Sequence, residues 1–215
     1  MQFIYERELL PTITIKGDNY KYLIKVRRFK IDDFVNVTDF KKIFSYKIKK
    51  VDKKEVILSR IEELNIDKKL KKFHIGWCKI DSKNVEKVLP SLNEIGVTKI
   101  TFIDCDRSQG NFKIKMERLE KILINSSQQC GRLEQMEIDF CESLDKFLEL
   151  YPEAVICDFG GEEIKDNQIE IVVVGCEGGF TERERKLFKK VISFNTSSVL
   201  RSETATISIA SKVLL

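Results

Sequence analysis

Histidine is scarce in this sequence, which has a single one, His74, among 215 residues. Histidine is a common zinc ligand and the usual base of a nucleophilic triad, so its scarcity restricts both kinds of site. A zinc site is not expected, and a histidine-dependent triad would have to use His74 itself. Because His74 lies inside FHIGWCKI, a segment typical of a strand, we interpret it as a residue of the core or of a sheet surface.

Long apolar runs and a secretory signal are also missing. No hydrophobic stretch approaches the roughly 20 residues that a membrane-spanning helix needs. The first ten residues include Glu6, Arg7 and Glu8, where a signal peptide has an apolar segment. These observations predict a cytoplasmic protein with no membrane partner.

Paired cysteine motifs are absent, although the chain has six cysteines. They are widely separated, none belongs to a C-x-x-C pair, and most lie in apolar or helical surroundings. This pattern predicts reduced, mostly buried thiols and no metal site. The cysteines are Cys78, Cys105, Cys130, Cys141, Cys157 and Cys176.

The composition is that of a globular protein, with 33% charged and 42% hydrophobic residues. A chain of this length can bury one large core, or a small domain beside a medium one, and we favour two domains. The net charge of +4 is uneven: residues 1–70 hold 17 lysines and arginines against 11 aspartates and glutamates, which leaves −2 for the remainder. Aromatic residues are interleaved with these basic ones, which favours a surface that contacts phosphates and stacks bases. A solvated face of a lysine-rich protein is the alternative.

Residues 34–61 have the short alternating pattern of antiparallel strands. The segments FVNVTDF, KIFSYKIKKV and EVILSRI are the predicted strands, with turns at residues 40–42 and 52–54. The pattern predicts a small antiparallel barrel. The charged segment over residues 62–72 is interpreted as a linker.

A short helix is expected before these strands, over residues 19–26. Asp18 would cap it, and Tyr22, Leu23 and Val26 would point inward.

Beyond residue 72 the pattern alternates strand and helix, which predicts an α/β domain with a mainly parallel sheet. One helix is expected to begin at Asp81 or Ser82 and to end at Gly96; Pro90 would either kink it or lie where the lost hydrogen bond is tolerated. Residues 205–213 fit both a strand and a helix, so the pattern leaves the C-terminus open. The predicted strands are residues 73–80, 99–105, 154–158, 169–174 and 191–194.

A second, longer helix is expected after residue 110. Its apolar residues recur on one face, which indicates a core stripe and not a cofactor site. The far end, SSQQCGR, is polar and is expected near a site. The stripe consists of Phe112, Met116, Leu119 and Leu123.

The most informative segment is IEIVVVGCEGGFTERE, residues 169–184, where an apolar strand breaks into a glycine-rich turn and opens a helix. Its β-branched residues indicate a central parallel strand. Gly175, Gly178 and Gly179 permit positive φ and let a ligand approach bare backbone. Thr181 forms a capping box with the glutamate three residues later, so the helix is expected to begin there. The arrangement favours a cofactor loop in the crevice beyond the strand, with a plain strand-to-helix turn as the alternative.

Four motifs in the second half, in this order, resemble the ribosomal RNA small subunit methyltransferase E family of SPOUT (trefoil-knot) methyltransferases. They are NEIGVTKI with DRS, QQCGR, GCEGGF and SVLRSETA. The basic N-terminal barrel is similar to the PUA-like RNA-binding domain of that family. The resemblance implies a PUA-like β-barrel over residues 1–67 and a SPOUT methyltransferase domain over residues 68–215, with a deep C-terminal knot. It also implies that residues 203–215 are helical.

The activity that this resemblance implies is methylation of N3 of a uridine in 16S ribosomal RNA, with S-adenosylmethionine as the methyl donor. The implied partners are 16S rRNA or the small ribosomal subunit, and a second copy of the chain in a homodimer, with no metal. Two alternatives remain open. One is a related knotted methyltransferase that acts on another RNA such as tRNA, and the other is a noncatalytic RNA-binding protein.

The site residues that the resemblance implies fall into two groups. The cofactor pocket would be formed by Gly175, Glu177, Gly178, Gly179, Leu200, Arg201, Thr204 and Ala205. The RNA would be held by Arg107, Gln129, Arg132 and Arg201, and the basic N-terminal pattern adds Arg27, Arg28, Lys49 and Lys50.

Four positions depart from the family pattern, and two of them lose a basic residue. The proline of GPEGG is Cys176, the first arginine of RILR is Ser198, the glutamate of EQ is Gln128, and the lysine before the ELG-like turn is Ser91. Since methyl transfer from a sulfonium needs no covalent enzyme intermediate, we interpret Cys176 as a small filler and not a nucleophile.

The chemistry narrows the catalytic candidates. N3 of a uracil must lose a proton before it attacks, and a guanidinium aimed at O2 or O4 would stabilise the developing imidate in a dry site. Arg201 is the first candidate for this role and Arg132 the second. Without a suitable histidine, Glu203 or solvent would remove the proton. Glu203 also has a structural interpretation, because the helix dipole favours an acid in the first turn.

Overall fold

The computed structural model describes residues 3–65, 70–108, 110, 113–164 and 168–215. The chain forms two compact units, an N-terminal unit of residues 1–69 and 127–135 and a C-terminal unit of residues 70–126 and 136–215. The predicted domain boundary at residues 67 and 68 falls outside the described residues. Residues 127–135, which contain QQCGR, group with the N-terminal unit, and no sequence pattern indicates this.

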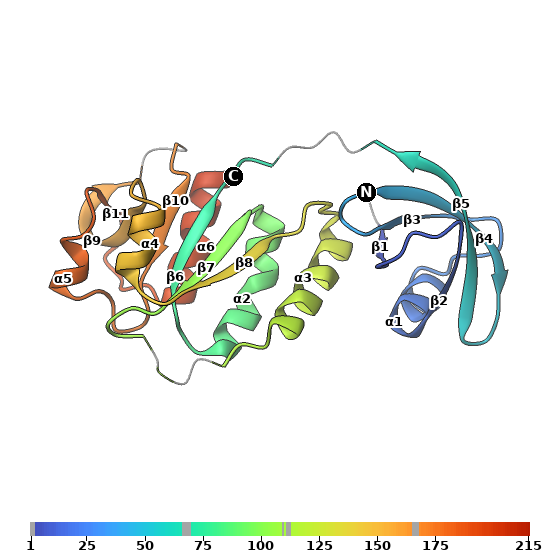
Figure 1. Ribbon diagram of the computed structural model, residues 1–215, viewed down its shortest axis with the longest axis horizontal. Coiled ribbons are helices and arrows are strands. Elements are labelled where there is room, and N and C mark those ends of the chain that lie inside the picture. Colours follow the sequence, from blue (N-terminus) through green and yellow to red (C-terminus); the bar gives the residue numbers. More distant parts are fainter. Residues whose placement is uncertain (1–2, 66–69, 109, 111–112, 165–167) are drawn as a thin grey trace. The chain divides into compact units, whose positions relative to one another are not determined.

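The N-terminal unit is built on a five-stranded sheet with the order β1-β3-β4-β5-β2 (Figure 1). Neighbouring strands are antiparallel, except that β1 runs parallel to β3. The three predicted strands are present as β3, β4 and β5, whereas β1 and β2 were not predicted. Their bounds are Ile4–Tyr5 (β1), Thr12–Lys16 (β2), Phe34–Thr38 (β3), Ile43–Val51 (β4) and Glu55–Leu64 (β5).

The predicted linker is wrong at its start, because β5 continues to Leu64. The last three residues of β5 pair with the start of β4, where Glu62 lies opposite Ser45 and Leu64 lies opposite Ile43. The exposed carboxylates of this stretch fit a solvated strand as well as a linker, so charge alone misidentifies it. Residues 66–69 of the predicted linker lie outside the described residues.

The predicted N-terminal helix is present with a different geometry. It consists of α1 (Gly17–Tyr20) followed by a π-helical segment, η1 (Lys21–Val26). Asp18 lies within the first turn and is not the cap, since Lys16 occupies the N-cap position. Leu23 is buried, but Val26 is 67% exposed, contrary to the prediction. The i→i−5 bond from Arg27 N to Tyr22 O shows that the 3.6-residue period assumed for the inward face does not hold here.

The C-terminal unit contains a six-stranded parallel sheet with the order β11-β9-β10-β6-β7-β8. The apolar strand before the glycine turn, β10, lies between β9 and β6, so its predicted central position is confirmed. Side chains from these strands form the core, in which Trp77 and Phe102 are fully buried. The strand bounds are His74–Cys78 (β6), Lys99–Ile103 (β7), Glu137–Cys141 (β8), Val155–Glu163 (β9), Ile171–Val174 (β10) and Val191–Ser193 (β11).

The first helix of this unit, α2 (Ser82–Ile95), follows its sequence signals closely. The Asp81 side chain accepts a hydrogen bond from Lys83 N and caps the start, and Gly96 ends the helix in the left-handed region at φ 110°. Pro90 lies inside the helix, as predicted. α2 packs against the C-terminal helix α6 (Ser202–Leu214), which confirms the helical C-terminus.

The remaining helices are α3 (Met116–Cys130), α4 (Leu144–Leu150) and α5 (Glu182–Arg185). In α3 the predicted stripe residues Leu119 and Leu123 are buried, and Phe112 lies outside the described residues. α4 and the edge strand β8 were not predicted. β8 is short and largely solvent-facing, so it lacks the apolar run that identifies a buried parallel strand.

His74 is a buried residue of β6, 7% exposed, which confirms its interpretation as a core residue. Its Nε2 lies 2.8 Å from the Thr101 hydroxyl, and its ring packs edge-on against Phe147 and Tyr151. Burial, reinforced by the positive charge of Lys99, lowers the pKa of His74 from 6.5 to about 4. The folded state therefore keeps this imidazole neutral under conditions in which the unfolded chain protonates it.

This difference predicts a pH-dependent stability. Between pH 6.5 and pH 4 the unfolded state binds a proton that the native state does not, so the free energy of unfolding falls as the pH falls. From pH 7 to pH 5 the loss attributable to His74 is about 2 kcal/mol. In urea titrations at both pH values, His74→Gln should reduce the pH-dependent loss by that amount. Since the chain has no other histidine, an equal loss in the variant would contradict the assignment.

Candidate functional site

The glycine-rich segment after β10 forms a turn at the carboxyl end of the parallel sheet. The capping box is confirmed: the Thr181 hydroxyl accepts from Glu184 N, and the Glu184 carboxylate accepts from Thr181 N at 2.9 Å. The Glu184 side chain is completely buried, and the helix that it caps, α5, has only four residues. Because α5 is so short, the main effect of the capping box is to hold the backbone where the glycine turn ends.

The segment before α6 lies opposite this turn. Arg201 occupies the N-cap position of α6, and the next residue, Ser202, is buried. The Ser202 hydroxyl accepts a hydrogen bond from Trp77 Nε1 at 2.8 Å and donates one to the carbonyl oxygen of Gly175. Ser202 thus joins the sheet, the glycine turn and α6. Sequence reasoning missed it, because a serine at a helix start has many local explanations.

Between these segments lies a cavity of about 420 Å³. Of the residues predicted to bind the cofactor, all except Thr204 line it: Gly175, Glu177, Gly178, Gly179, Leu200, Arg201 and Ala205. Thr204 is exposed, and Glu203 does not line the cavity either. The volume and the mixture of apolar side chains with bare backbone are those of a small-molecule site.

Residues 157–160, within β9, also line the cavity, and sequence reasoning missed them. Phe159 is 61% exposed, and Asp158 forms an ion pair with Arg185 at 2.9 Å. The sequence contains a sign of this part of the cavity, the glycine pair of DFGG at the end of a predicted strand. However, nothing in the sequence indicates that β9 lies beside β10.

Two glycines of the turn are required by the geometry. At Gly179 φ is +65°, a conformation that side chains disfavour. At Gly178 an added Cβ would lie 3.2 Å from Cβ of Arg107 and 3.4 Å from its Cδ. Gly179 thus allows the left-handed backbone conformation of the turn, and Gly178 allows the DRS segment to approach it closely.

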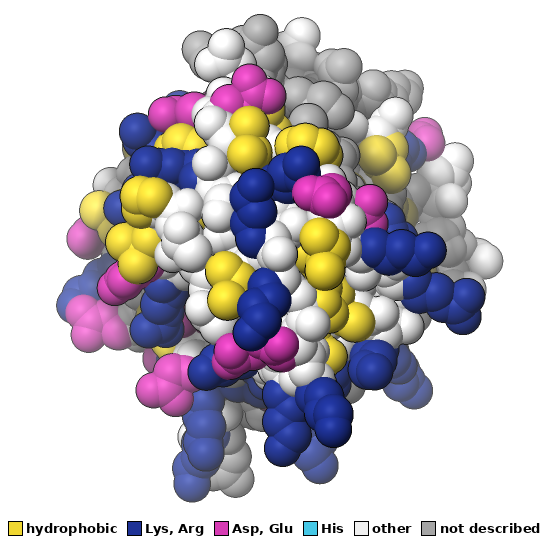
Figure 2. All heavy atoms as spheres, turned by 90° about the vertical axis from the view of Figure 1, so that its right-hand side faces the viewer, with side chains coloured by type: hydrophobic (Ala, Val, Ile, Leu, Met, Phe, Trp, Pro, Cys, Tyr) yellow, Lys and Arg dark blue, Asp and Glu magenta, His cyan; other side chains and the backbone are white. Residues whose placement is uncertain are grey.

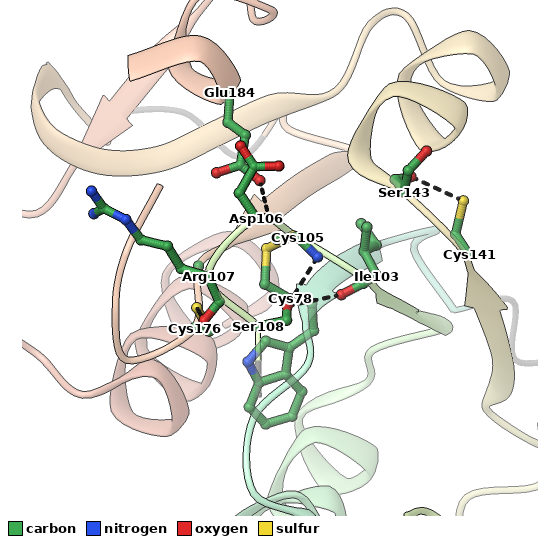
Figure 3. Close-up of a disulfide and its surroundings, with 12 residues drawn as sticks. Cys78, Ile103, Cys105, Asp106, Arg107, Ser108, Cys141, Ser143, Cys176 and Glu184 are labelled. Atoms are coloured by element: carbon green, nitrogen blue, oxygen red, sulfur yellow. Dashed lines mark hydrogen bonds between the residues drawn. A yellow bond between two sulfur atoms is a disulfide. The ribbon is translucent and has the colours of Figure 1, made fainter. Parts of the chain in front are cut away.

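The DRS segment, residues 106–108, follows β7 and contacts the glycine turn (Figure 3). Asp106 N donates to Glu184 Oε1 at 2.9 Å, and the Asp106 carboxylate accepts from Thr181 and from Arg183. The hydrogen bond with Arg183 lowers the pKa of Asp106, so this carboxylate stays ionised at neutral pH. Arg107, predicted to hold RNA, is exposed and donates to the Gly178 carbonyl at 2.8 Å.

The prediction of reduced thiols is wrong for Cys78 and Cys105, which form a disulfide beside the DRS segment (Figure 3). Cys78 ends β6 and lies opposite Ile103 of β7, two residues before Cys105. Neighbouring parallel strands thus bring their Cα atoms to 5.7 Å, within the range for a disulfide. A separation of 27 residues in sequence gives no sign of this proximity.

The remaining cysteines are free thiols in the described residues, and Cys130 is exposed, contrary to the expected burial. Cys176 is buried in the glycine turn, and its Sγ donates to the Arg107 carbonyl at 3.1 Å. Burial raises the pKa of the Cys176 thiol, which supports its interpretation as a filler and not a nucleophile.

Glu203, the candidate base, lies in the first turn of α6. One of its carboxylate oxygens is buried and has no hydrogen-bond partner among the residues that the structure describes. Its role as a base stays a prediction.

The other RNA-binding candidates belong to the N-terminal unit. Gln129 and Arg132 come after Gln128 in the sequence. The Gln128 side chain accepts a hydrogen bond from Tyr5 N at 3.0 Å. Arg132 is only 8% exposed; its Nε donates to the Glu134 carbonyl at 2.7 Å, and burial lowers its pKa. The structure thus gives Arg132 a backbone anchor within its own unit.

Lysine and arginine side chains are spread over the face of the N-terminal unit seen in Figure 2, with small hydrophobic patches between them. Arg27, Arg28, Lys49 and Lys50 are exposed in this unit. Lys47 lies over the ring of Phe34, which is 57% exposed, at 5.9 Å from its centroid. Basic and aromatic side chains therefore share one accessible surface, as nucleic-acid stacking requires.

Two features are absent from the residues that the structure describes. No helix in this part of the chain is long and apolar enough to cross a membrane. No group of three or more His, Cys, Asp or Glu side chains there is placed to hold a metal ion.

Comparison with known families identifies both halves of the chain. A family model described as an RNA methyltransferase domain matches residues 67–214, and one described as an RNA methyltransferase PUA domain matches residues 15–59. Ribosomal RNA small subunit methyltransferase E of Helicobacter pylori (strain J99 / ATCC 700824) is 36% identical over 225 residues, which cover 98% of each chain.

Solved structures agree on the fold. A methyltransferase from Legionella pneumophila, in complex with SAM, has a TM-score of 0.80 at 24% identity and covers 98% of this chain and 95% of its own. Ribosomal RNA small subunit methyltransferase E from Neisseria gonorrhoeae, bound to S-adenosyl methionine, has a TM-score of 0.77 at 20% identity, with 98% and 96% covered. The predicted fold class is thereby confirmed.

Proposed function

Since the chain belongs to the ribosomal RNA small subunit methyltransferase E family, we propose that it is an S-adenosylmethionine-dependent methyltransferase that modifies N3 of a uridine in 16S ribosomal RNA. The observation that carries this proposal is the cavity at the carboxyl end of β10, lined by the glycine turn and by residues 198–202. Open parallel sheets bind ligands at this edge.

The donor set of the cavity fits S-adenosylmethionine. Bare backbone at Gly178 and Gly179 can meet polar groups of a ligand, while Leu200 and Ala205 offer apolar atoms to a base. Glu177 supplies a carboxylate for a cationic ligand. When bound, S-adenosylmethionine would supply a methyl group activated by a sulfonium.

The residues of this chain would contribute alignment and charge stabilisation. Arg201 lines the cavity, and within the described residues its guanidinium makes no hydrogen bond or ion pair, so it is available to a substrate. Directed at O2 or O4 of a uracil, it would stabilise the negative charge that develops as N3 loses its proton. Glu203, in the same helical turn, is the candidate acceptor of that proton.

RNA would be held by the N-terminal unit. Lys49, Lys50, Lys53 and Lys54 flank the turn between β4 and β5, and all four are exposed. The ion pair of Lys50 with Asp52, at 2.8 Å, is too exposed to offset its attraction for a phosphate.

Removal of these four lysines by substitution with glutamine should weaken RNA binding and flatten its salt dependence. If all four neutralise phosphates, the slope of log K against log salt should decrease by up to about 3. Filter binding over a salt series measures both quantities. The matched control removes Lys83, Lys87, Lys115 and Lys121 from the C-terminal unit, and equal slopes in the two variants would show that the lysines at the turn are only solvated.

A homodimer in the cytoplasm is the proposed state of the molecule. The C-terminal unit exposes Val199, which lines the cavity, at 78%, and it exposes the C-terminal residue Leu215 at 89%; exposed apolar residues favour self-association. Analytical ultracentrifugation should give a dimer, and a monomer at micromolar concentration would contradict this part of the proposal.

The direct test of the function is mass spectrometry of ribosomal RNA from a deletion strain. One 3-methyluridine should be missing from 16S rRNA and should return when the purified protein and S-adenosylmethionine are added. A missing methyl group in tRNA would favour the alternative knotted methyltransferase. Failure to bind S-adenosylmethionine in calorimetry would favour a noncatalytic RNA-binding protein.

A further inference from the structure

We propose that Arg107 is a positioning residue that holds the glycine turn in the shape that binds the cofactor, a role distinct from the RNA contact that the resemblance implies. The inference rests on the proposed function, because it assigns S-adenosylmethionine to the cavity. Its basis is a set of contacts between the DRS segment and residues 176–180.

The guanidinium of Arg107 bridges two carbonyl groups of the turn. Its Nη1 donates to the Gly178 oxygen at 2.8 Å and to the Phe180 oxygen at 3.3 Å. These two residues flank Gly179, and all three line the cavity. Because one cationic group engages the carbonyl on either side of Gly179, the left-handed conformation at this residue is held from outside the turn.

The rest of Arg107 contacts the same turn. Its aliphatic stem covers Gly178 so closely that an added Cβ would lie 3.2 to 3.8 Å from three of its carbons. Its carbonyl oxygen accepts from Cys176 Sγ at 3.1 Å (Figure 3). Both the main chain and the side chain of Arg107 therefore contact the turn, at Cys176, Gly178 and Phe180.

The residues next to Arg107 in the sequence are themselves held by other contacts. Cys105 is joined to Cys78 by the disulfide, and Cys105 N donates to Ser108 Oγ at 2.9 Å. Asp106 N donates to the buried Glu184, whose carboxylate closes the capping box of α5. Arg107 is thus anchored between the end of β7 and the start of α5, which suits a residue that orders a neighbouring loop.

A loop ordered before the ligand arrives binds more tightly, because the ordering cost does not fall on the binding step. We therefore expect Arg107→Ala to weaken S-adenosylmethionine binding by about 10- to 100-fold, the range for loss of hydrogen bonds from a charged donor. Arg107→Lys keeps the charge but lacks the planar fork, so its affinity should lie between those of wild type and Arg107→Ala.

Calorimetry with S-adenosylmethionine and filter binding with 16S rRNA separate the two roles. A positioning role raises the Kd and the KM for S-adenosylmethionine, leaves kcat at saturating cofactor within about threefold of wild type, and leaves the Kd for RNA unchanged. Arg118→Ala is the matched control, because Arg118 is an arginine of the same unit whose guanidinium pairs with Glu86 at 3.1 Å. Melting temperatures show whether each variant is folded, and Arg107→Gln, which keeps most of the side-chain volume, replaces Arg107→Ala if the latter is not.

The outcomes are distinct. Weaker RNA binding with unchanged cofactor affinity would overturn the inference and favour the RNA contact. Unchanged affinity for both ligands, in folded variants, would overturn it as well. If the wild-type chain binds no S-adenosylmethionine, the proposed function fails and the inference fails with it, whereas wild-type binding that Arg107→Ala leaves intact defeats the inference alone.

Discussion

Gly178→Val is expected to lower the affinity for S-adenosylmethionine by at least about a hundredfold, while the fold stays intact. A single Cβ at this position already lies 3.2 Å from Arg107, and valine adds two methyl groups. The new side chain must displace Arg107 or enter the cavity that Gly178 lines. Either result removes the close approach of ligand to backbone. Calorimetry measures the affinity, and circular dichroism verifies the fold.

The matched control is Gly110→Val. Among the described residues, an added Cβ at Gly110 meets no atom within 4 Å, and this glycine does not line the cavity. Its variant should bind S-adenosylmethionine as the wild type does. Wild-type affinity in a folded Gly178→Val protein would show that the turn is only a connection between β10 and α5.

Arg201→Ala should lower the rate of single-turnover methyl transfer by at least about a hundredfold, with little change in melting temperature. An arginine that served as a structural fork would bond to carboxylates or carbonyls of its own chain. In the part of the chain that is described, the Arg201 guanidinium has no such partner, so its removal leaves no internal group unpaired. Removal of Arg201 should therefore raise the activation free energy of methyl transfer and leave the free energy of unfolding nearly unchanged.

Arg201→Lys distinguishes charge from geometry. A lysine retains the charge but cannot present two parallel donors to a base, so its rate should stay well below wild type if the fork matters. Calorimetry must show that the cofactor remains bound in both variants. A rate near wild type in a stable, cofactor-bound Arg201→Ala protein would make Arg132 the leading candidate.

Features encoded within a few residues were predictable. The capping box at Thr181 and the caps of α2 at Asp81 and Gly96 depend on neighbours in sequence, and the apolar run of β10 was enough to predict its central position. Most of the predicted cofactor residues line one cavity, because the glycine turn and the start of α6 each carry a local motif. Which of them contact the cofactor stays a prediction.

Features that depend on distant segments were not predictable from one sequence. The Cys78–Cys105 disulfide requires the register of β6 against β7, and the contribution of Phe159 requires β9 to lie beside β10. Residues 127–135 group with the N-terminal unit although residues 70–126 of the C-terminal unit separate them from it in sequence. The error at Val26 has a local cause, since a π-helical turn changes which side chains face inward. The knot implied by the resemblance stays a prediction.

The strand order of the C-terminal unit also constrains how the chain folds during synthesis. β6 is made early but cannot complete its pairing until β10, nearly a hundred positions later, inserts between it and β9. Such a sheet has high contact order, so it should fold slowly and only after most of the chain has left the ribosome. A nascent chain that stops before residue 171 exposes one edge of β6, an apolar strand with unpaired backbone groups. Premature termination in this region should therefore give aggregation-prone fragments rather than a partly active enzyme.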